Sequence, residues 1–293
     1  MSRHIRQFTA FACIDWSGAA VARPAGIAVA VAQGKSAPQL IEPVGGWSRS
    51  AVLAWLLTHV HKGTDMLVGF DLSPSLPYLD ENAYFPGWKD SPNNPRSLWQ
   101  QVDSVCASDA HLAANTYVDH PAIAPYFRRH GGREGALFGG GIGRLREVER
   151  YQRATGQGRS ASCFNLVGAA QVGKSSLTGM RLFNRLESRI PFWPFDSLPS
   201  KGPAMIEIYT SIAARAAGVP PHRSKIREQE ALREALARLN SPAPTISRLD
   251  DHATDALVTA AWMRQVANNR DLWHPQPMTR EVAQQEGWTF GII

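Results

Sequence analysis

The sequence predicts an α/β domain in which helices flank a mixed five-stranded sheet, with a large insertion between the fourth and fifth strands. Two observations predict this architecture. The first 75 residues follow the order strand, strand, strand, helix, strand, and the next clear strand appears only after residue 200. We therefore expect residues 1–293 to form a single domain, with residues 76–200 as a helical and irregular insertion within it.

The first three strands are apolar segments separated by short turns. They lie at residues 8–15, 26–32 and 39–44, with glycines at the turns. Because the connections between consecutive strands are short, these segments predict an antiparallel meander. The first strand ends at Asp15.

A helix and a fourth strand follow the meander. Ser48 is a suitable N-cap for a helix at 48–61, in which Val52, Leu56 and Val60 recur at helical spacing. The fourth strand, 65–71, has the apolar composition of a buried strand and ends at Asp71.

The second half of the chain is less regular. The insertion predicts helices at about 96–115, 142–154 and 175–188, among many prolines and tryptophans. A fifth strand is expected at 204–209, followed by helices at 212–217, 226–239 and 250–267.

The last helix begins with side chains that can bind a metal. Asp251, His252 and Asp255 lie in its first turns, after which the helix becomes apolar. Because His252 and Asp255 are three residues apart, they share one face of the helix. Asp250 is better explained as the N-cap.

Two earlier carboxylates are expected to lie near this helix. The element order is that of the ribonuclease-H-like fold, in which the first and fourth strands are parallel neighbours and the final helix crosses the sheet there. Asp15 and Asp71 would then lie side by side, close to His252 and Asp255. Clustered carboxylates repel one another and need a cation, and such oxygen ligands suit Mg²⁺ or Mn²⁺. Two such ions can promote phosphodiester hydrolysis.

Short motifs spread along the chain carry a family resemblance. They are Ile14-Asp-Trp-Ser, Val68-Gly-Phe-Asp-Leu-Ser-Pro, Ile206-Glu-Ile-Tyr, Asp251-His-Ala-Thr-Asp-Ala-Leu and Glu286-Gly-Trp-Thr-Phe-Gly. The set resembles the family known as domain of unknown function 429, described as predicted nucleases of ribonuclease-H-like fold with a RuvC-type acidic site. The resemblance implies a metal-dependent nuclease whose catalytic and metal-binding residues are Asp15, Asp71, His252 and Asp255.

The chain departs from the expected pattern in two ways. The predicted helix at 48–61 contains no acidic residue, so the carboxylate that ribonuclease H carries there is absent. The RuvC branch has Glu on the fourth strand, whereas this chain has the shorter Asp71. Glu207 on the fifth strand is expected near the site as an outer metal ligand.

A competing phosphate-binding motif lies at residues 168–175. This segment fits the P-loop pattern G-x-x-x-x-G-K-[ST], in which Lys174 would reach phosphate oxygens and Ser175 would hold Mg²⁺. The strand that ends in a metal-binding Asp lies before the motif, whereas a P-loop fold needs it afterwards. Three interpretations remain open: an ATPase or kinase site, a glycine turn before a helix, and contact between Lys174 and a substrate phosphate at the carboxylate site.

The charge balance is compatible with an anionic partner such as nucleic acid. The formal net charge is +6 and the pI about 9.5, with basic patches at 128–133, 144–159 and 222–227. These patches also suit a family member that binds nucleic acid or a phosphorylated metabolite without cleaving it. Three cysteines without a C-x-x-C pair predict reduced core thiols. No segment resembles a signal peptide or membrane span, so we expect a cytoplasmic protein without a membrane partner.

Overall fold

A six-stranded mixed sheet forms the centre of the protein. The computed structural model describes residues 6–129, 131, 133–168, 172–220, 225–246 and 249–293, and the strand order is β3-β2-β1-β4-β8-β7. The strands are β1 Ala10–Asp15, β2 Ala28–Gln33, β3 Gln39–Leu40, β4 Met66–Asp71, β7 Phe192–Trp193 and β8 Ala204–Glu207.

The strand directions combine an antiparallel meander with a parallel half. β1 pairs antiparallel with β2, as does β2 with β3, whereas β4 runs parallel to both β1 and β8. β7 runs parallel to β8 at the edge and makes the sheet one strand larger than the predicted five. The two residues of β7 are too few to produce a periodic sequence signal.

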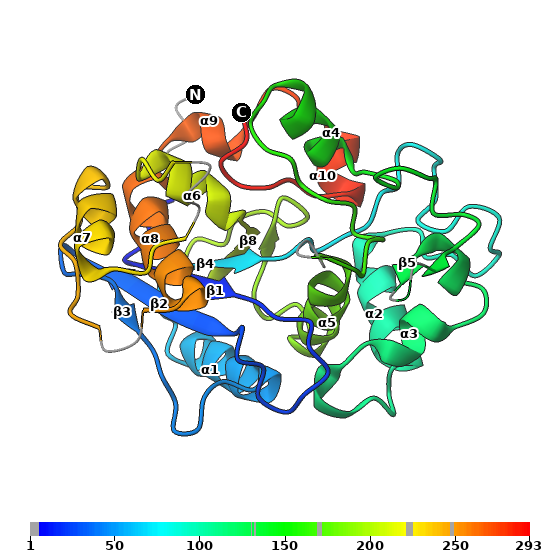
Figure 1. Cartoon of the computed structure of the whole chain (residues 1–293), viewed down its shortest axis with the longest axis horizontal. Coiled ribbons are helices and arrows are strands. Elements are labelled where there is room, and N and C mark those ends of the chain that lie inside the picture. The colour runs from blue at the N-terminus through cyan, green and yellow to red at the C-terminus, as the bar shows by residue number, and fades with distance from the viewer. Residues whose placement is uncertain (1–5, 130, 132, 169–171, 221–224, 247–248) are drawn as a thin grey trace.

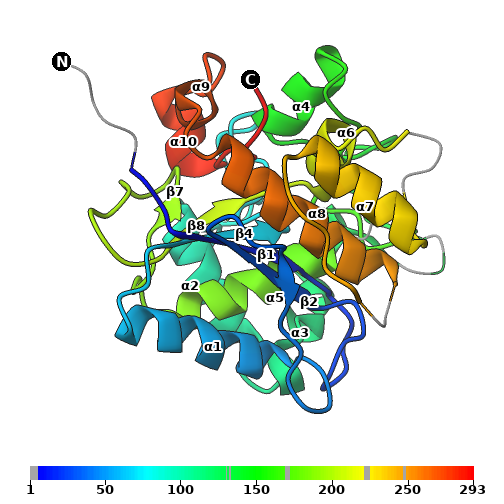
Figure 2. The same cartoon turned by 90° about the vertical axis from the view of Figure 1, so that its left-hand side faces the viewer.

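Helices cover both faces of the sheet (Figures 1 and 2). On one face α8 crosses β1 and β2, with α6 and α7 packed beside it. The other face is covered by α1, α5 and α2. Their bounds are α1 Arg49–His61, α2 Pro95–Val105, α5 Val172–Arg185, α6 Thr210–Ala216, α7 Gln229–Arg238 and α8 Asp251–Val266.

Alternation along the strands explains this three-layer packing. Ala12 and Ile14 of β1 belong to a buried cluster with α1 and α5. Phe11 and Cys13 belong to a second cluster with α8. Successive side chains of a strand point to opposite faces, so Asp15, which follows Ile14, projects on the α8 face.

The helices α2, α5 and α3 (Asn115–Asp119) of the insertion lie on one side of the sheet, whereas its residues 147–154 lie on the α8 side (Figures 1 and 2). The guanidinium of buried Arg181 in α5 donates to Asp103 of α2 at 2.9 Å and to the carbonyl of Ala113. α5 therefore joins the insertion to the sheet. The remaining elements are η1 Ala110–Leu112, α3 Asn115–Asp119, η2 Ala124–Tyr126, β5 Arg128–Arg129, β6 Arg133–Glu134, α4 Glu147–Ala154, α9 Arg270–Trp273 and α10 Arg280–Gln285.

Two predicted helices of the insertion have different bounds in the structure. The helix expected at 96–115 ends at Val105, where Cys106 leaves helical geometry, and the positive φ of His111 and Leu112 prevents a regular helix from continuing to residue 115. The helix expected at 142–154 begins at Glu147, after Gly143, which also has positive φ. None of the helices in the described part of the chain is long and apolar enough to cross a membrane.

Candidate functional site

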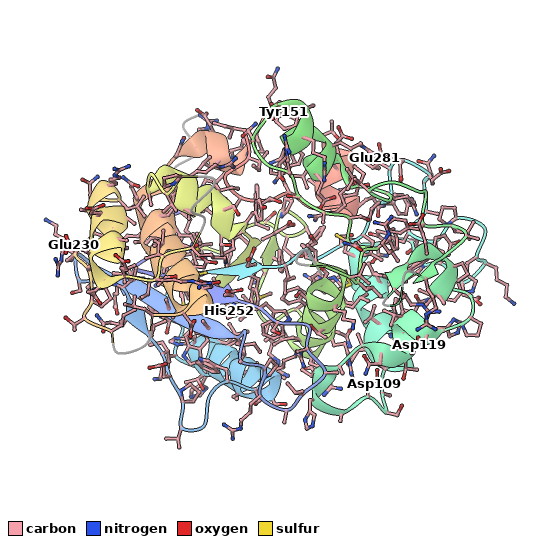
Figure 3. All side chains as sticks on the ribbon, viewed as in Figure 1. Asp109, Asp119, Tyr151, Glu230, His252 and Glu281 are labelled. Carbon is pink, nitrogen blue, oxygen red and sulfur yellow. The ribbon has the colours of Figure 1, made fainter. Side chains whose placement is uncertain are left out.

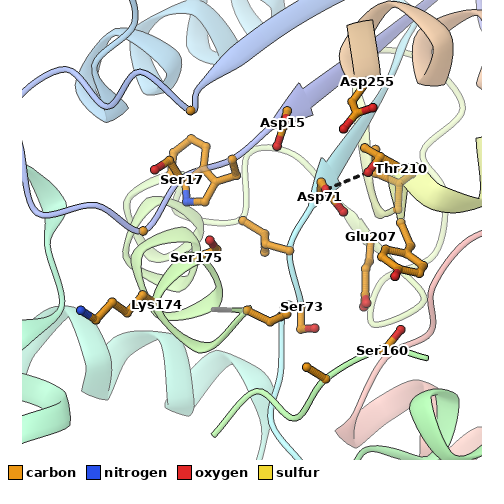
Figure 4. Close-up of a pocket in the computed structure, with 18 of the residues that line it drawn as sticks. Asp15, Ser17, Asp71, Ser73, Ser160, Lys174, Ser175, Glu207, Thr210 and Asp255 are labelled. Atoms are coloured by element: carbon orange, nitrogen blue, oxygen red, sulfur yellow. Dashed lines mark hydrogen bonds between the residues drawn. The ribbon is translucent and has the colours of Figure 1, made fainter. Parts of the chain in front are cut away.

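Two aspartates end neighbouring parallel strands. Asp15 is the last residue of β1 and Asp71 the last of β4, and the strand register pairs them with each other. Neighbouring strands lie about 4.8 Å apart, and paired residues of parallel strands project to the same face. The structure therefore brings the two predicted carboxylates side by side, as Figure 4 shows.

The N-terminal end of α8 brings two more predicted site residues to the same place. Asp250 is its N-cap, accepting a hydrogen bond from the Ala253 amide at 2.9 Å. His252, which lies close to β1 (Figure 3), has Nδ1 2.8 Å from Oδ2 of Asp15. Asp255 faces the same cavity as Asp15 and Asp71. Three elements thus supply one imidazole and three carboxylates.

A cavity of about 730 Å³ opens at the ends of β1 and β4. Its wall contains Asp15, Asp71, His252 and Asp255. Lys174 and Ser175, from the first turn of α5, also line it. Gly18 permits the close contact between the loop after β1 and α5, because a Cβ at Gly18 would lie 2.5 Å from the carbonyl carbon of Lys174. The cavity is therefore closed on one side by the start of α5.

Burial makes the carboxylates of this cavity difficult to ionise. Desolvation, reinforced by the charges of Asp15 and Asp255, raises the pKa of Asp71 to about 8. Desolvation also raises the pKa of Asp15 and of Asp255. The hydrogen bond to Asp15 raises the pKa of His252. The nearby positive charge is therefore too small to keep all three carboxylates ionised at their ordinary pKa values.

Each aspartate nevertheless has a partner. His252 contacts Asp15, Nζ of Lys225 lies 2.9 Å from Oδ2 of Asp255, and the Thr210 hydroxyl donates to Oδ2 of Asp71 at 3.2 Å. Within the described residues, no three His, Cys, Asp or Glu side chains are arranged to hold a metal ion together. A cation bound by Asp255 would have to compete with the Lys225 ammonium for that carboxylate.

Glu207 lines the same cavity, as Figure 4 shows, but its carboxylate is held by an arginine. The register pairs Glu207 with Phe70, whose side chain belongs to the cluster on the α1 and α5 face, opposite to that of Asp71. Both of its carboxylate oxygens accept hydrogen bonds from buried Arg146, at 2.8 and 2.6 Å. Because Arg146 already neutralises this carboxylate, we leave Glu207 out of the proposed ligands, and its role as an outer metal ligand stays a prediction.

Lys174 and Ser175 lie at the cavity without forming a P-loop unit. Residues 169–171 of the motif are outside the described residues. The segment before it, 163–167, forms an isolated bridge between Asn165 and Arg128 and is no strand of the main sheet, whereas a P-loop follows such a strand. The Lys174 ammonium has no hydrogen bond or ion pair with a described residue and points away from the three aspartates in Figure 4. Lys174 is thus a cation at the far side of the cavity that no described residue neutralises.

Most arginines of the predicted basic patches are paired with carboxylates or buried within the protein. Arg128 pairs with Glu134, Arg144 pairs with Asp80, and Arg146 is buried. Arg159 is different, because it lines the cavity and has no hydrogen bond or ion pair with a described residue. Residues 222–224 of the third patch lie outside the described residues.

The chain was also compared with protein-family models, with curated proteins and with solved structures. None of these comparisons found a match. The family resemblance stays a prediction, and the function has to be argued from the site itself.

Several residues of the site were not predicted from the sequence. Tyr209 and Thr210 follow β8 directly, so their position after a strand of the parallel half was a signal that could have identified them. Lys225 was noted only as part of a basic patch, and its pairing with Asp255 has no local signal. Arg146 resembled a surface arginine in the sequence, because nothing near it indicates burial.

Proposed function

We propose that the protein is a divalent-metal-dependent phosphodiesterase of ribonuclease-H-like fold that cleaves nucleic acid. The fold proposal is supported by a three-stranded antiparallel meander, by β4 and β8 running parallel beyond β1, and by a late helix crossing the sheet. The observation that carries the function is the pairing of Asp15 with Asp71 in the cavity that Asp255 also lines.

The chemistry of the donor set fits Mg²⁺ or Mn²⁺. Three carboxylates that are shielded from solvent in one cavity repel each other, and a divalent cation relieves that repulsion. Asp15, Asp71 and Asp255 would hold the cation, and Lys225 would then be released from Asp255. The cation supplies positive charge that activates a water and stabilises the negative charge developing on the phosphate.

The chain's own groups supply orientation and proton transfer. The contact between Nδ1 of His252 and Asp15 fixes the imidazole, whose Nε2 is then available for a proton. The raised pKa of His252, caused by its hydrogen bond to Asp15, favours the protonated ring, so Nε2 can donate a proton to the leaving oxygen. Lys225, once released, can neutralise a phosphate oxygen.

Cleavage assays with Mn²⁺ on single-stranded, duplex and branched DNA and RNA test this function. We expect Asp71→Asn and Asp255→Asn to lower the rate at least about 100-fold, more than the loss of a group behind the metal ligands. Asp119→Asn is the matched control, because Asp119 is exposed and lies well away from His252 in Figure 3. Its rate should stay within about twofold of the wild type, since the substitution removes only a surface ion pair.

Two results would contradict the proposal. One is cleavage by Asp71→Asn at the wild-type rate. The other is a folded wild-type protein that binds nucleic acid but cuts none of the substrates in the presence of Mn²⁺. That result would favour a protein that binds nucleic acid without cleaving it.

A further inference from the structure

A second cavity of about 580 Å³ opens directly beside the carboxylate cavity. The two cavities share wall residues from the loop after α4, from the start of α6, from the segment before α7 and from α8. They are Arg159, Tyr209, Thr210, Lys225 and Asp255. A chain-like ligand can therefore extend from one cavity into the other, passing Tyr209.

Tyr209 presents an unused aromatic surface at this junction. It is the N-cap residue of α6 and is partly buried, with its ring packed against the core cluster that contains α8. In the described part of the chain its ring has no aromatic partner and its hydroxyl no hydrogen bond. A Cβ at Gly158 would make an ordinary contact with Cε1 of Tyr209, at 3.5 Å, so the loop after α4 lies beside this edge of the ring. An aromatic ring supported on one side is a platform for a nucleic-acid base.

The second cavity is also cationic. Its wall carries Arg153, Arg159, Arg215 and Lys225 against the single carboxylate of Asp255. Arg153 and Arg215 donate to the carbonyls of Ser160 and Gln157, which leaves their charges uncompensated. Lys225 already neutralises Asp255. Three positive charges therefore remain for an anionic ligand.

We propose that the second cavity binds the nucleotide adjacent to the scissile phosphate, with its base stacked on Tyr209 and its phosphate held by Arg159 and Arg215. This inference rests on the proposed function, which locates the scissile phosphate at the aspartates. A base can stack on Tyr209 only when it is unpaired. The substrate is thus an unpaired nucleic-acid strand, and a small phosphoester would fill only the first cavity. Contacts to phosphate and to a base face carry no sequence preference.

Binding measured in a chelator tests this subsite separately from cleavage. Fluorescence anisotropy with a labelled 12-nucleotide single strand, in DNA and RNA forms, gives Kd for the full chain. We expect Tyr209→Ala to raise Kd about 5- to 100-fold, since stacking contributes about 1–3 kcal/mol per base. Tyr209→Phe keeps the ring and should stay within about twofold.

Charge variants provide a second measurement on an exposed residue whose replacement does not disturb packing. Arg159→Ala should weaken binding and lower the salt dependence of log Kd by about one unit of slope, because one phosphate contact is lost. Arg189→Ala is its control, since Arg189 is exposed, pairs with Glu187 and lines neither cavity. If Tyr209→Ala does not fold, the Kd of Arg159→Ala and its salt dependence test the subsite on their own.

Three results would overturn the subsite. They are a duplex that binds as tightly as the single strand, an unchanged Kd in folded Tyr209→Ala and Arg159→Ala, and a mononucleotide that competes as well as the oligonucleotide. A strand that binds through Tyr209 but is never cut would support the subsite and contradict the proposed nuclease. A strand that Tyr209→Ala cuts as well as the wild type does would support the proposed nuclease and contradict the subsite.

Discussion

Asp71 lies in the proposed metal site, and its ionisation there lowers the stability of the folded protein. It ends a buried strand and faces Asp15 across the strand register. Burial first, and then the charges of Asp15 and Asp255, raise its pKa from the ordinary 3.8 to about 8. Without a cation, the protein therefore binds a proton at Asp71 that the unfolded chain does not bind at neutral pH.

This pKa predicts a pH dependence of stability in the absence of divalent cations. Between pH 3.8 and about 8 the folded state binds more protons at Asp71 than the unfolded state, so its contribution to the free energy of unfolding falls as pH rises. Asp71→Asn removes this loss and should be the more stable protein at pH 8 by at least about 1 kcal/mol, or a Tm higher by about 2–4 °C. Thermal melts of both proteins from pH 5 to 8 measure it. Parallel curves for the two proteins would show that Asp71 ionises as in water.

The sequence predicted some site residues better than others for a physical reason. Asp15 and Asp71 could be predicted because each ends an apolar strand, and His252 and Asp255 because helical spacing gives them one face. Glu207 lies at the cavity as expected, but its ion pair with Arg146 could not be predicted, because the two residues are 61 positions apart in the chain. The ion pair between Lys225 and Asp255 joins residues thirty positions apart and leaves no local pattern.

At the scale of elements, a buried arginine ties α4 to the central strands. Arg146, just before α4, contacts Glu149, Glu207 and the hydroxyl of Ser73, which lies two residues after Asp71. Its side chain is about 1% exposed. The arginine therefore holds the segment after β4 and the end of β8 in fixed positions beside the cavity.

Removing this arginine should be costly. Arg146→Ala leaves two buried carboxylates, Glu149 and Glu207, without their cation, and we expect a loss of about 3–5 kcal/mol in the free energy of unfolding. The matched control is Arg150→Ala, whose half-exposed pair with Glu147 should contribute under about 1 kcal/mol. Urea denaturation compares them. Equal midpoints for the two variants would mean that the buried network does not stabilise the fold.

Element prediction succeeded where periodicity is long and failed where tertiary contacts decide. The meander, α1, β4 and α8 lie where the apolar pattern indicates, with bounds that differ by a few residues. β7 and the hairpin of β5 and β6 have two residues per strand and exist only through their neighbours. The predicted start of the last insertion helix at 175 was too late, because Val172 and Gly173 already belong to α5.

At the scale of the whole molecule, the central sheet and the insertion together make the cavity. Strands β1 and β4 and helix α8 contribute the carboxylates and His252, whereas α5 at the end of the insertion contributes Lys174 and Ser175. The net charge of the chain is +6, and many of its arginines form ion pairs within the fold. Arg159 and Lys174, which line the cavity, have no ion pair with a described residue. An anionic ligand in this cavity would therefore meet two cations that no described carboxylate neutralises.

The central claim is that Asp15, Asp71 and Asp255 form a divalent-cation site. Electron paramagnetic resonance of free Mn²⁺ during a titration measures binding directly and requires no substrate. We expect saturable binding that strengthens from pH 6 to 9, because the cation competes with the proton on Asp71, whose pKa is about 8. The same titration should show this binding lost in Asp71→Asn and Asp255→Asn and kept in Asp119→Asn. Mn²⁺ binding that is absent from the wild type, or unchanged in both site variants, would contradict the account.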